Sequence, residues 1–463
     1  MRRLRGVVGL LAMQALLYPK KFSRAISGGC LMAALGWLGQ AARAQLVEPT
    51  EGHFTYPGRE EGAAWRREAQ ARIELLRKGD FTIKATDASG TPLAGASVRL
   101  EEVRSAFQWG TAVPFGRIVG DGPDDRRFRQ LLLELFNEVS PENDLKWPVW
   151  EGDWGPGFSR GQSLAALRWL QARHFYVRGH NLVWPGKMPD WKDLPENVKR
   201  LRGTPRQGEI PGLVLDHIRD ITSATRGLID EWDVVNEPFD HHALMDLFGE
   251  RIMADWFRAA REGAPGALLF LNDWGNQDLL ADPAHCRNTY DTVAFLRGSG
   301  APLTALGLQC HIGRQPTSPE NLLGTLDLYA ALRIPIRITE FDVNTDDEEL
   351  QADYTRDFLI LAFSHPSVIG VQLWGFWEKT HWRPKAAMYR ADWSEKPNAR
   401  VYRSLVLDRW RTRIDATTGA GGTCAARGFY GDYVATVDFH GRRAEQAFAL
   451  RPGAPTAVVV RLP

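Results

Sequence analysis

Between about residues 107 and 408, short apolar runs alternate with longer segments whose apolar residues recur at helical spacing. Such runs favour buried strands, and strands that alternate with helices favour a parallel sheet. Eight β–α repeats over about 300 residues predict an α/β fold, a closed (β/α)₈ TIM barrel. A doubly wound open sheet is the alternative, but its typical glycine-rich phosphate loop does not follow the first strand. The strand candidates are Gln108–Ala112, Glu134–Val139, Phe175–His180, Glu231–Asn236, Leu268–Asn272, Ala305–Gln309, Arg333–Thr339 and Val368–Trp374.

Both flanks of this region show the two-residue alternation of half-buried strands, for example in Phe81–Thr86 and Thr456–Leu462. Neither flank holds enough strands for a stable sheet by itself. We therefore predict a small β-sandwich formed from N- and C-terminal segments, residues 79–106 plus 421–463, with the barrel at 107–415 inserted into it. The sandwich could bind sugar, dock a partner or brace the barrel, and we favour a brace because it ties both chain ends together.

The first 44 residues have the pattern of a targeting segment. Arginines precede an apolar run, and Ala42-Arg43-Ala44 fits signal-peptidase cleavage after Ala44. We expect residues 1–44 to be a signal peptide, residues 45–78 to be a linker and amphipathic helix, and the protein to be secreted or periplasmic. A second apolar run follows the first, so a true start at Met13 or an uncleaved anchor is the alternative.

Charge and cysteine usage restrict the possible partners. The formal net charge is +1 over 463 residues, and basic residues form no stripe. We therefore expect no nucleic-acid partner, no membrane contact beyond the targeting segment, and a monomer. Once Cys30 is removed with the signal peptide, an odd number of cysteines is left, which favours buried free thiols at Cys286, Cys310 and Cys424.

Two strand candidates lead into a glutamate. Trp232-Asp233-Val234-Val235-Asn236-Glu237-Pro238 ends at a proline, which cannot continue a central strand, and Ile336-Arg337-Ile338-Thr339-Glu340-Phe341-Asp342 has the same form. Catalytic side chains of such barrels come from the C-terminal tips of different strands. Glycoside hydrolysis needs one carboxylic acid and one carboxylate across the scissile bond, and this pair of glutamates can supply both.

The other strand tips carry amides, imidazoles and tryptophans, which suit sugar hydroxyls and the apolar faces of sugar rings. They lack the spacing of a metal site. The pattern His-Glu-x-x-His is absent, and the adjacent His241 and His242 would face apart on a strand. We expect no metal and no cofactor, and we assign no role to the loop that holds these two histidines.

Taken in order, these tips resemble the motifs of the family 10 glycoside hydrolases, the endo-β-1,4-xylanase family. The resemblance covers about residues 110–410 and implies a retaining endo-β-1,4-glycanase, an endo-1,4-β-xylanase acting on xylan without a cofactor. The flanking halves resemble a split transthyretin-like or carboxypeptidase-regulatory-like sandwich. The matching segments are Phe136-Asn137, Pro141-Glu142-Asn143-Asp144-Leu145-Lys146-Trp147, Arg178-Gly179-His180-Asn181-Leu182-Val183-Trp184, Trp232 to Pro238, Leu271-Asn272-Asp273, Gly307-Leu308-Gln309-Cys310-His311, Ile338 to Asp342, and Leu373-Trp374-Gly375.

The resemblance also implies roles for individual residues. Glu237 would be the general acid/base and Glu340 the nucleophile. His311 would keep Glu340 ionised, and Asp342, on the same face of the strand as Glu340, would orient His311. Two glutamates with different jobs at one pH need environments that separate their pKa values. The substrate-binding residues implied are Glu142, Asn143, Lys146, His180, Trp184, Asn236, Gln309, His311, Trp374 and Trp382.

Two departures from the family pattern concern substrate preference. Pro185 follows Trp184 where the family commonly has histidine, and Phe376 to Arg383 departs from the usual eighth-strand loop. Action on another β-glycan or on oligosaccharides is therefore an open alternative. A non-catalytic carbohydrate-binding protein on the same barrel is another, and the intact pair Glu237 and Glu340 argues against it.

Overall fold

The structure, a computed structural model, describes residues 54–453 and 456–463. Eight parallel strands form a barrel in the order β3-β4-β5-β6-β7-β8-β10-β11, which closes because β11 pairs with both β10 and β3. The predicted (β/α)₈ barrel is confirmed. Its strands are β3 (Gln108–Val113), β4 (Glu138–Pro141), β5 (Tyr176–Gly179), β6 (Glu231–Asn236), β7 (Leu268–Asp273), β8 (Ala305–Leu308), β10 (Ile336–Val343) and β11 (Val368–Leu373), with short β9 (His311–Ile312) beside β10.

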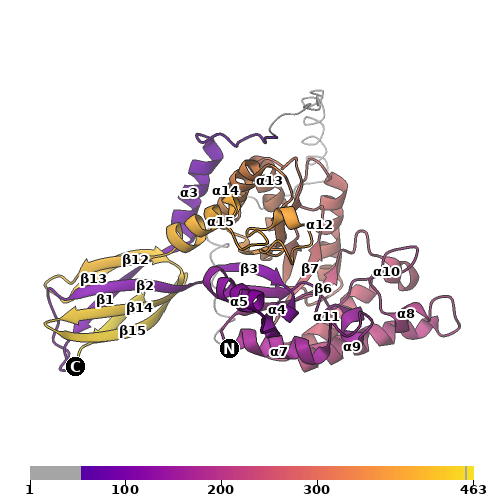
Figure 1. Cartoon of the computed structure of the whole chain (residues 1–463), viewed down its shortest axis with the longest axis horizontal. Coiled ribbons are helices and arrows are strands. Elements are labelled where there is room, and N and C mark those ends of the chain that lie inside the picture. The colour runs from indigo at the N-terminus through magenta and orange to yellow at the C-terminus, as the bar shows by residue number, and fades with distance from the viewer. Residues whose placement is uncertain (1–53, 454–455) are drawn as a thin grey trace.

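Helices surround these strands (Figure 1). Their inward residues are apolar and join the strands in one continuous core. Among the described helices, none is both long and apolar enough to cross a membrane. The helices are α3 (Ala64–Leu76), α4 (Phe115–Val119), α5 (Pro123–Leu135), α6 (Trp147–Glu151), α7 (Arg160–Gln171), α8 (Glu196–Lys199), α9 (Ile210–Ala224), α10 (Ala243–Phe248), α11 (Ile252–Gly263), α12 (Pro283–Gly298), α13 (Pro319–Ala330), α14 (Glu348–Ser364) and α15 (Pro397–Tyr402).

The two chain ends form a pair of sheets beside the barrel (Figure 1). One sheet has the order β13-β1-β16 and the other β12-β2-β14-β15, so both combine N-terminal with C-terminal strands. The prediction that both ends contribute to one small sandwich is confirmed. Residues 1–44, the predicted signal peptide, lie outside the described part of the chain. The strands are β1 (Lys78–Thr86), β2 (Ser97–Ser105), β12 (Arg413–Thr417), β13 (Thr423–Phe429), β14 (Gly431–Phe439), β15 (Arg442–Leu450) and β16 (Thr456–Arg461).

One predicted boundary is wrong. We assigned residues up to 415 to the barrel and began the C-terminal part of the sandwich at 421, but β12 pairs with β2 in the sandwich. The apolar residues of β12 are Ile414 and Ala416 alone, between exposed polar neighbours, so its hydrophobic signal is weak. Cys286, Cys310 and Cys424 are buried free thiols, as predicted.

Arg77 joins the sandwich to the barrel. It lies between α3 and β1, and its guanidinium donates to the carbonyls of Phe363 (2.6 Å), His365 (2.7 Å) and Val368 (2.9 Å). Burial lowers the pKa of Arg77 to about 9. Three hydrogen bonds to fixed carbonyls hold this buried charge, so the start of β1 is anchored to the end of α14 and to β11.

Five ionisable side chains are fully buried near the N-terminal ends of the barrel strands, and we call them the basal ion cluster: Glu138, Arg178, Glu231, Asp233 and Arg337. Arg337 donates to Glu138 (2.6 Å) and Glu231 (2.9 Å), and Arg178 donates to Glu231 (3.0 Å) and to Asp233. Burial alone would lower the pKa of Arg337, but the charges of Glu138 and Glu231 raise it above its ordinary value. Each of the five side chains therefore contacts a group of opposite type, although burial still raises the pKa of Glu138 to about 8.

Candidate active site

Glu237 comes directly after β6, at the carboxyl end of the barrel strands. Its backbone is left-handed, with a φ of 53°, a conformation that costs a non-glycine residue about 1 kcal/mol or more. The Glu237 N–H donates to the carbonyl of Asn272 on neighbouring β7 (2.8 Å), which helps to hold this turn. Strained backbone of this kind is concentrated at functional sites.

Glu340 lies inside β10, whereas we predicted that the strand would end just before it. The strand continues to Val343 because Asp342 and Val343 pair with His311 and Ile312 of β9. This pairing was not predicted, because β9 is only two residues long. It places His311 beside both acidic residues of β10.

Two amide residues connect the two glutamates. Asn272 accepts the Glu237 N–H at its carbonyl, and its Nδ2 donates to Glu340 Oε1 (2.9 Å). Gln309 makes the reverse pair of contacts: its Nε2 donates to Glu237 Oε1 (2.8 Å), and its carbonyl accepts the Glu340 N–H (3.0 Å). The two carboxyl groups are therefore fixed relative to each other through two hydrogen-bonded links.

Asn272 is itself held by its neighbours. Its Nδ2 also donates to Asn236 Oδ1 (2.8 Å), and Thr339 Oγ1 donates to its Oδ1 (2.7 Å). A Cβ at Gly307 would lie 2.3 Å from Asn272 Oδ1 and 3.0 Å from Thr339 Cγ2. Glycine on β8 thus leaves the room in which Asn272 can reach Asn236 and Glu340.

Glu340 is kept ionised. Burial would raise its pKa, but the hydrogen bond from His311 and the charge of His180 lower it below the ordinary value. His311 lies with Nε2 3.2 Å from Glu340 Oε2 and with Nδ1 2.9 Å from Asp342 Oδ2. Burial opposes protonation of His311, but the charge and hydrogen bond of Asp342 raise its pKa to about 9. At neutral pH the imidazolium donates to both carboxylates.

Glu237 has the opposite environment. Burial raises its pKa to about 7, and the charge of Glu340 acts in the same direction. The hydrogen bond from Gln309 and the charge of His241 oppose this rise. Near neutral pH, Glu237 therefore holds a proton while Glu340 is ionised. Acid catalysis next to a carboxylate requires this difference in protonation.

Aromatic side chains lie next to this pair. His180 follows β5, and its Nδ1 lies 2.9 Å from Asp233 Oδ2. The Trp374 ring meets the His180 ring edge-on at 5.1 Å and is buried, whereas Trp382 is 47% exposed. Trp382 Nε1 donates to Asp342 Oδ2 (2.9 Å). Trp374 is therefore buried beside the pair, whereas Trp382 is partly exposed, with the Arg383 guanidinium 4.1 Å from its ring centroid.

A second polar group follows β4. Lys146 Nζ donates to Asn143 Oδ1 (2.7 Å) and lies 4.9 Å from the ring centroid of Trp184. Burial lowers the pKa of Lys146, and the charges of Glu340 and Glu142 oppose this shift. Burial likewise raises the pKa of Glu142, against the charge of Lys146. The predicted binding residues after β4 and β5 thus lie within electrostatic reach of Glu340.

A family model described as glycosyl hydrolase family 10 matches residues 101–404. The chain belongs to glycosyl hydrolase family 10. Among curated relatives of this family 10 chain, the anti-sigma-I factor RsgI6 of Acetivibrio thermocellus is 30% identical over 392 residues, and endo-1,4-beta-xylanase 1 of Arabidopsis thaliana is 27% identical over 367. The matches cover 82% and 79% of this chain but 48% and 37% of those proteins, so the chain spans at most about half their length.

Solved structures share the fold of this family 10 chain. The crystal structure of xylanase 10B from Thermotoga petrophila RKU-1 in complex with xylobiose aligns with a TM-score of 0.58 at 23% identity, over 66% of this chain and 95% of that one. Native xylanase 10B from Thermotoga maritima aligns with the same TM-score and identity, over 66% of this chain and 96% of that one.

Sequence reasoning missed several residues of this family 10 site. Asn272 and Asp233 stood in the motifs, but we gave them no role. We assigned His241 to a loop without a role, yet it is buried, with Nδ1 3.3 Å from Glu237 Oε2. Its position four residues after Glu237, in a turn that starts at Pro238, was the available signal. Asp193, which contacts His241, lies in a long loop that shows no motif.

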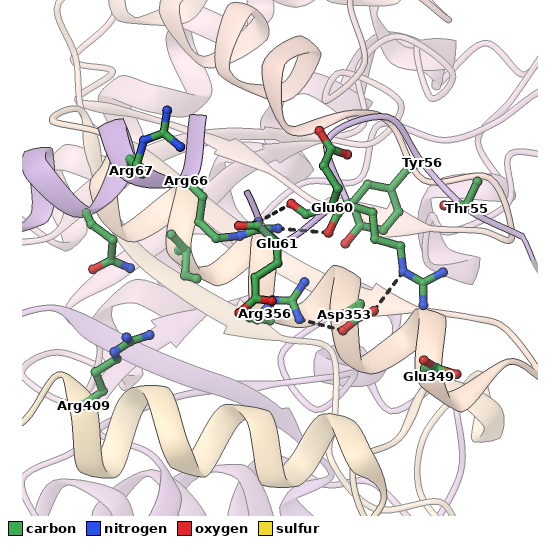
Figure 2. A pocket seen from close by; sticks show the side chains of 13 residues that line it. Thr55, Tyr56, Glu60, Glu61, Arg66, Arg67, Glu349, Asp353, Arg356 and Arg409 are labelled. Atoms are coloured by element: carbon green, nitrogen blue, oxygen red, sulfur yellow. Dashed lines mark hydrogen bonds and ion pairs between the residues drawn. The ribbon is translucent and has the colours of Figure 1, made fainter. Parts of the chain in front are cut away.

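A separate cavity of about 1040 Å³ lies between the segment before α3 and the helix α14 (Figure 2). It shares no lining residue with the glutamate site. In its wall, Asp353 accepts from Arg59 (2.8 Å) and Arg356 (2.7 Å). Among the described residues, no group of three or more His, Cys, Asp or Glu side chains is arranged to hold a metal ion.

Proposed function

We propose that the protein is a retaining endo-1,4-β-xylanase. The curated relatives that carry the name endo-1,4-beta-xylanase and the fold shared with a xylobiose-bound xylanase support the substrate class. The paired glutamates support the chemistry, because one is held protonated and the other ionised by named neighbours. The contacts of Asn272 and Gln309 with both glutamates are the single observation that carries the proposal.

In the first step, a carboxylate oxygen of Glu340 attacks the anomeric carbon and the bond to the leaving oxygen breaks. Glu237 gives its proton to that oxygen, so the departing sugar leaves as a neutral alcohol. The anomeric carbon is then bonded to Glu340 as an ester. Positive charge that develops on the sugar ring is stabilised by the Glu340 carboxylate, which lies in a buried site where charges interact strongly.

In the second step, Glu237 acts as a base. It takes a proton from water as the water oxygen attacks the anomeric carbon, and the carboxylate of Glu340 leaves. Two displacements at one carbon return the original configuration. His311 donates to Glu340 before and after the cycle, and Asp342 keeps the imidazole oriented and charged.

The remaining predicted residues are proposed to bind the polysaccharide. Asn236, held by Asn272, would bond the sugar 2-hydroxyl, a contact that strengthens in the transition state. Glu142, Asn143 and Lys146 would bind the next sugar on the non-reducing side. The other proposed contacts are His180, Trp184, Gln309, His311, Trp374 and Trp382.

Reducing-sugar release from xylan, carboxymethylcellulose and mannan tests this proposal. We expect release from xylan above the other two, and loss of that release in Glu340→Gln while xylo-oligosaccharide binding survives. Equal turnover in the Glu340→Gln variant would remove Glu340 from the mechanism. Faster release from another polymer would make that β-glycan, instead of xylan, the preferred substrate. Sugar binding without any release would indicate a non-catalytic carbohydrate-binding protein.

The cellular setting is a further proposal. The N-terminal sequence, with cleavage after Ala44, supports a secreted or periplasmic enzyme. Edman sequencing or mass spectrometry of the exported protein would identify its first residue. A mature chain that begins at Gln45 is expected, and a chain that keeps residues 1–44 would support the uncleaved anchor.

A further inference from the structure

The two carboxyl oxygens of Glu237 have different partners. Oε1 accepts from Gln309 (2.8 Å), a residue that the family resemblance places in the site. Oε2 lies 3.3 Å from Nδ1 of His241, which no family motif covers. The contact has the distance of an ion pair but not the geometry of a hydrogen bond, and Nδ1 makes no hydrogen bond to another described group. His241 is therefore the neighbour of the oxygen that Gln309 leaves free.

Asp193 holds the other side of the imidazole. Its Oδ2 lies 3.2 Å from His241 Nε2, and both side chains are largely buried, with 11% of Asp193 and 7% of His241 exposed. The Trp184 ring packs on the imidazole at 4.9 Å, and Lys146 lies on that same tryptophan. The imidazole is thus held by a carboxylate at one nitrogen, a carboxyl at the other and an aromatic ring on its side.

The backbone on both sides fixes this arrangement. The His241 N–H donates to the Glu237 carbonyl (2.9 Å), which closes one turn after β6. The Ala243 N–H donates to the carbonyl of Gly186 (3.0 Å), so this turn is tied to the loop that carries Asp193. Asp193 itself has a left-handed backbone, with a φ of 75°. A non-glycine residue held in this conformation is a frequent sign of a functional position.

We propose that Asp193 and His241 form a positioning dyad for Glu237, which holds its Oε2 as Gln309 holds its Oε1. This inference rests on the proposed role of Glu237 as acid and base. Asp193 orients the imidazole, and the imidazole fixes the rotamer of the carboxyl through both steps of the reaction.

The dyad affects the pKa of Glu237 and therefore the pH dependence of kcat/KM. The charge of His241 opposes the burial that raises the pKa of Glu237. The charged groups that face the imidazole are Glu237 and Asp193, with Lys146 behind Trp184. Replacing His241 by a neutral residue therefore raises the pKa of Glu237 further. Because Glu237 must be protonated in the first step, the basic limb of kcat/KM then moves to higher pH.

The variants are His241→Gln, Asp193→Asn and the double variant, with His242→Gln as a matched control. His242 is the adjacent residue, is exposed and pairs with Asp246 instead of Glu237. We expect the basic limb on xylohexaose to move up by about 0.5–1 pH unit in each dyad variant, with kcat about 10-fold lower. The double variant should match the single ones, because the two residues act as one unit. The control should match the parent.

A direct titration separates this inference from the proposed function. Infrared difference spectra between each protein and its Glu237→Gln derivative report the protonation of that carboxyl without any substrate. The dyad predicts a midpoint higher in His241→Gln and Asp193→Asn than in the parent, even if xylan is not the substrate. Lower kcat with an unmoved basic limb and an unmoved infrared midpoint would show that the pair only packs the loop, and would overturn the proposal.

Discussion

The barrel holds buried ionisable groups at both ends, but the partners of these groups differ between the two ends. In the basal ion cluster, each of the five side chains contacts a group of opposite charge. At the carboxyl end, Glu340 has an imidazolium partner, whereas Glu237 has an amide and a histidine that fail to offset its burial. The two arginines tie the buried acids of the base together, whereas Glu237 contacts no arginine and holds its proton next to an ionised carboxylate.

His180 connects the two ends. It bonds Asp233 of the basal ion cluster, and its charge lowers the pKa of Glu340. Asp233 also accepts from Arg178, so hydrogen bonds run from the basal ion cluster to His180, whose charge acts on the nucleophile. The comparison therefore predicts that substitutions at the base act on stability and substitutions at the carboxyl end act on turnover.

The largest effect is expected from Glu237→Ala. On xylan the leaving oxygen then lacks an acid, and kcat/KM should fall about 10³–10⁴-fold. A 2,4-dinitrophenyl xylobioside needs no acid in the first step, so its kcat/KM should fall far less. Azide should then accelerate turnover of this substrate and give a xylobiosyl azide, because a small anion needs no base. Equal losses on both substrates would contradict the acid role of Glu237.

Arg337→Met should give the largest loss of stability. It leaves Glu138 without its arginine and Glu231 with Arg178 alone, both fully buried, and should lower the free energy of unfolding by about 3–5 kcal/mol. Urea denaturation measures this loss. The control Arg443→Met removes an exposed pair with Glu445 and should change stability by less than about 1 kcal/mol. Similar values for the two variants would contradict the structural role of the cluster.

Gly307→Ala tests the link between the glutamates. The added methyl would meet Asn272 Oδ1 and displace the amide that donates to Glu340 and to Asn236. A misplacement of about 1 Å typically costs about 10²-fold in rate, and we expect that loss in kcat. Gly324→Ala on α13 is the control, since its Cβ meets no atom within 4 Å, and activity should not change. A fully active Gly307→Ala would show that the link is dispensable.

The smallest effect concerns the acidic limb of activity. His311 lowers the pKa of Glu340, which must be ionised to attack. His311→Gln removes that charge, so the pKa of Glu340 rises and the acidic limb of kcat/KM should move up by about 1 pH unit. The basic limb, set by Glu237 near pH 7, should move much less. A kcat/KM profile from pH 3 to 9 measures both limbs, and an unmoved acidic limb would rule out this role.

The sequence predicted the barrel because repeated strand and helix patterns extend over many residues and reinforce one another. Glu237 and Glu340 were found as the acids at the ends of two strand candidates, and strand alternation placed Asp342 on the face of Glu340, whereas His311 came from the family resemblance. The extension of β10 through β9 was missed, since a two-residue strand has no pattern of its own. The Asp193 contact was missed because it depends on how the long loop after β5 folds onto the short turn after β6, a tertiary contact without local periodicity.

The most direct test of the central claim is the anomeric configuration of the first product. Proton NMR of xylohexaose during the first minutes of hydrolysis shows whether the new reducing end is β or α before mutarotation equalises the two. Glu340 as nucleophile and Glu237 as acid and base predict the β anomer first, because two displacements retain configuration. Initial formation of the α anomer would show a single displacement by water and would contradict the account.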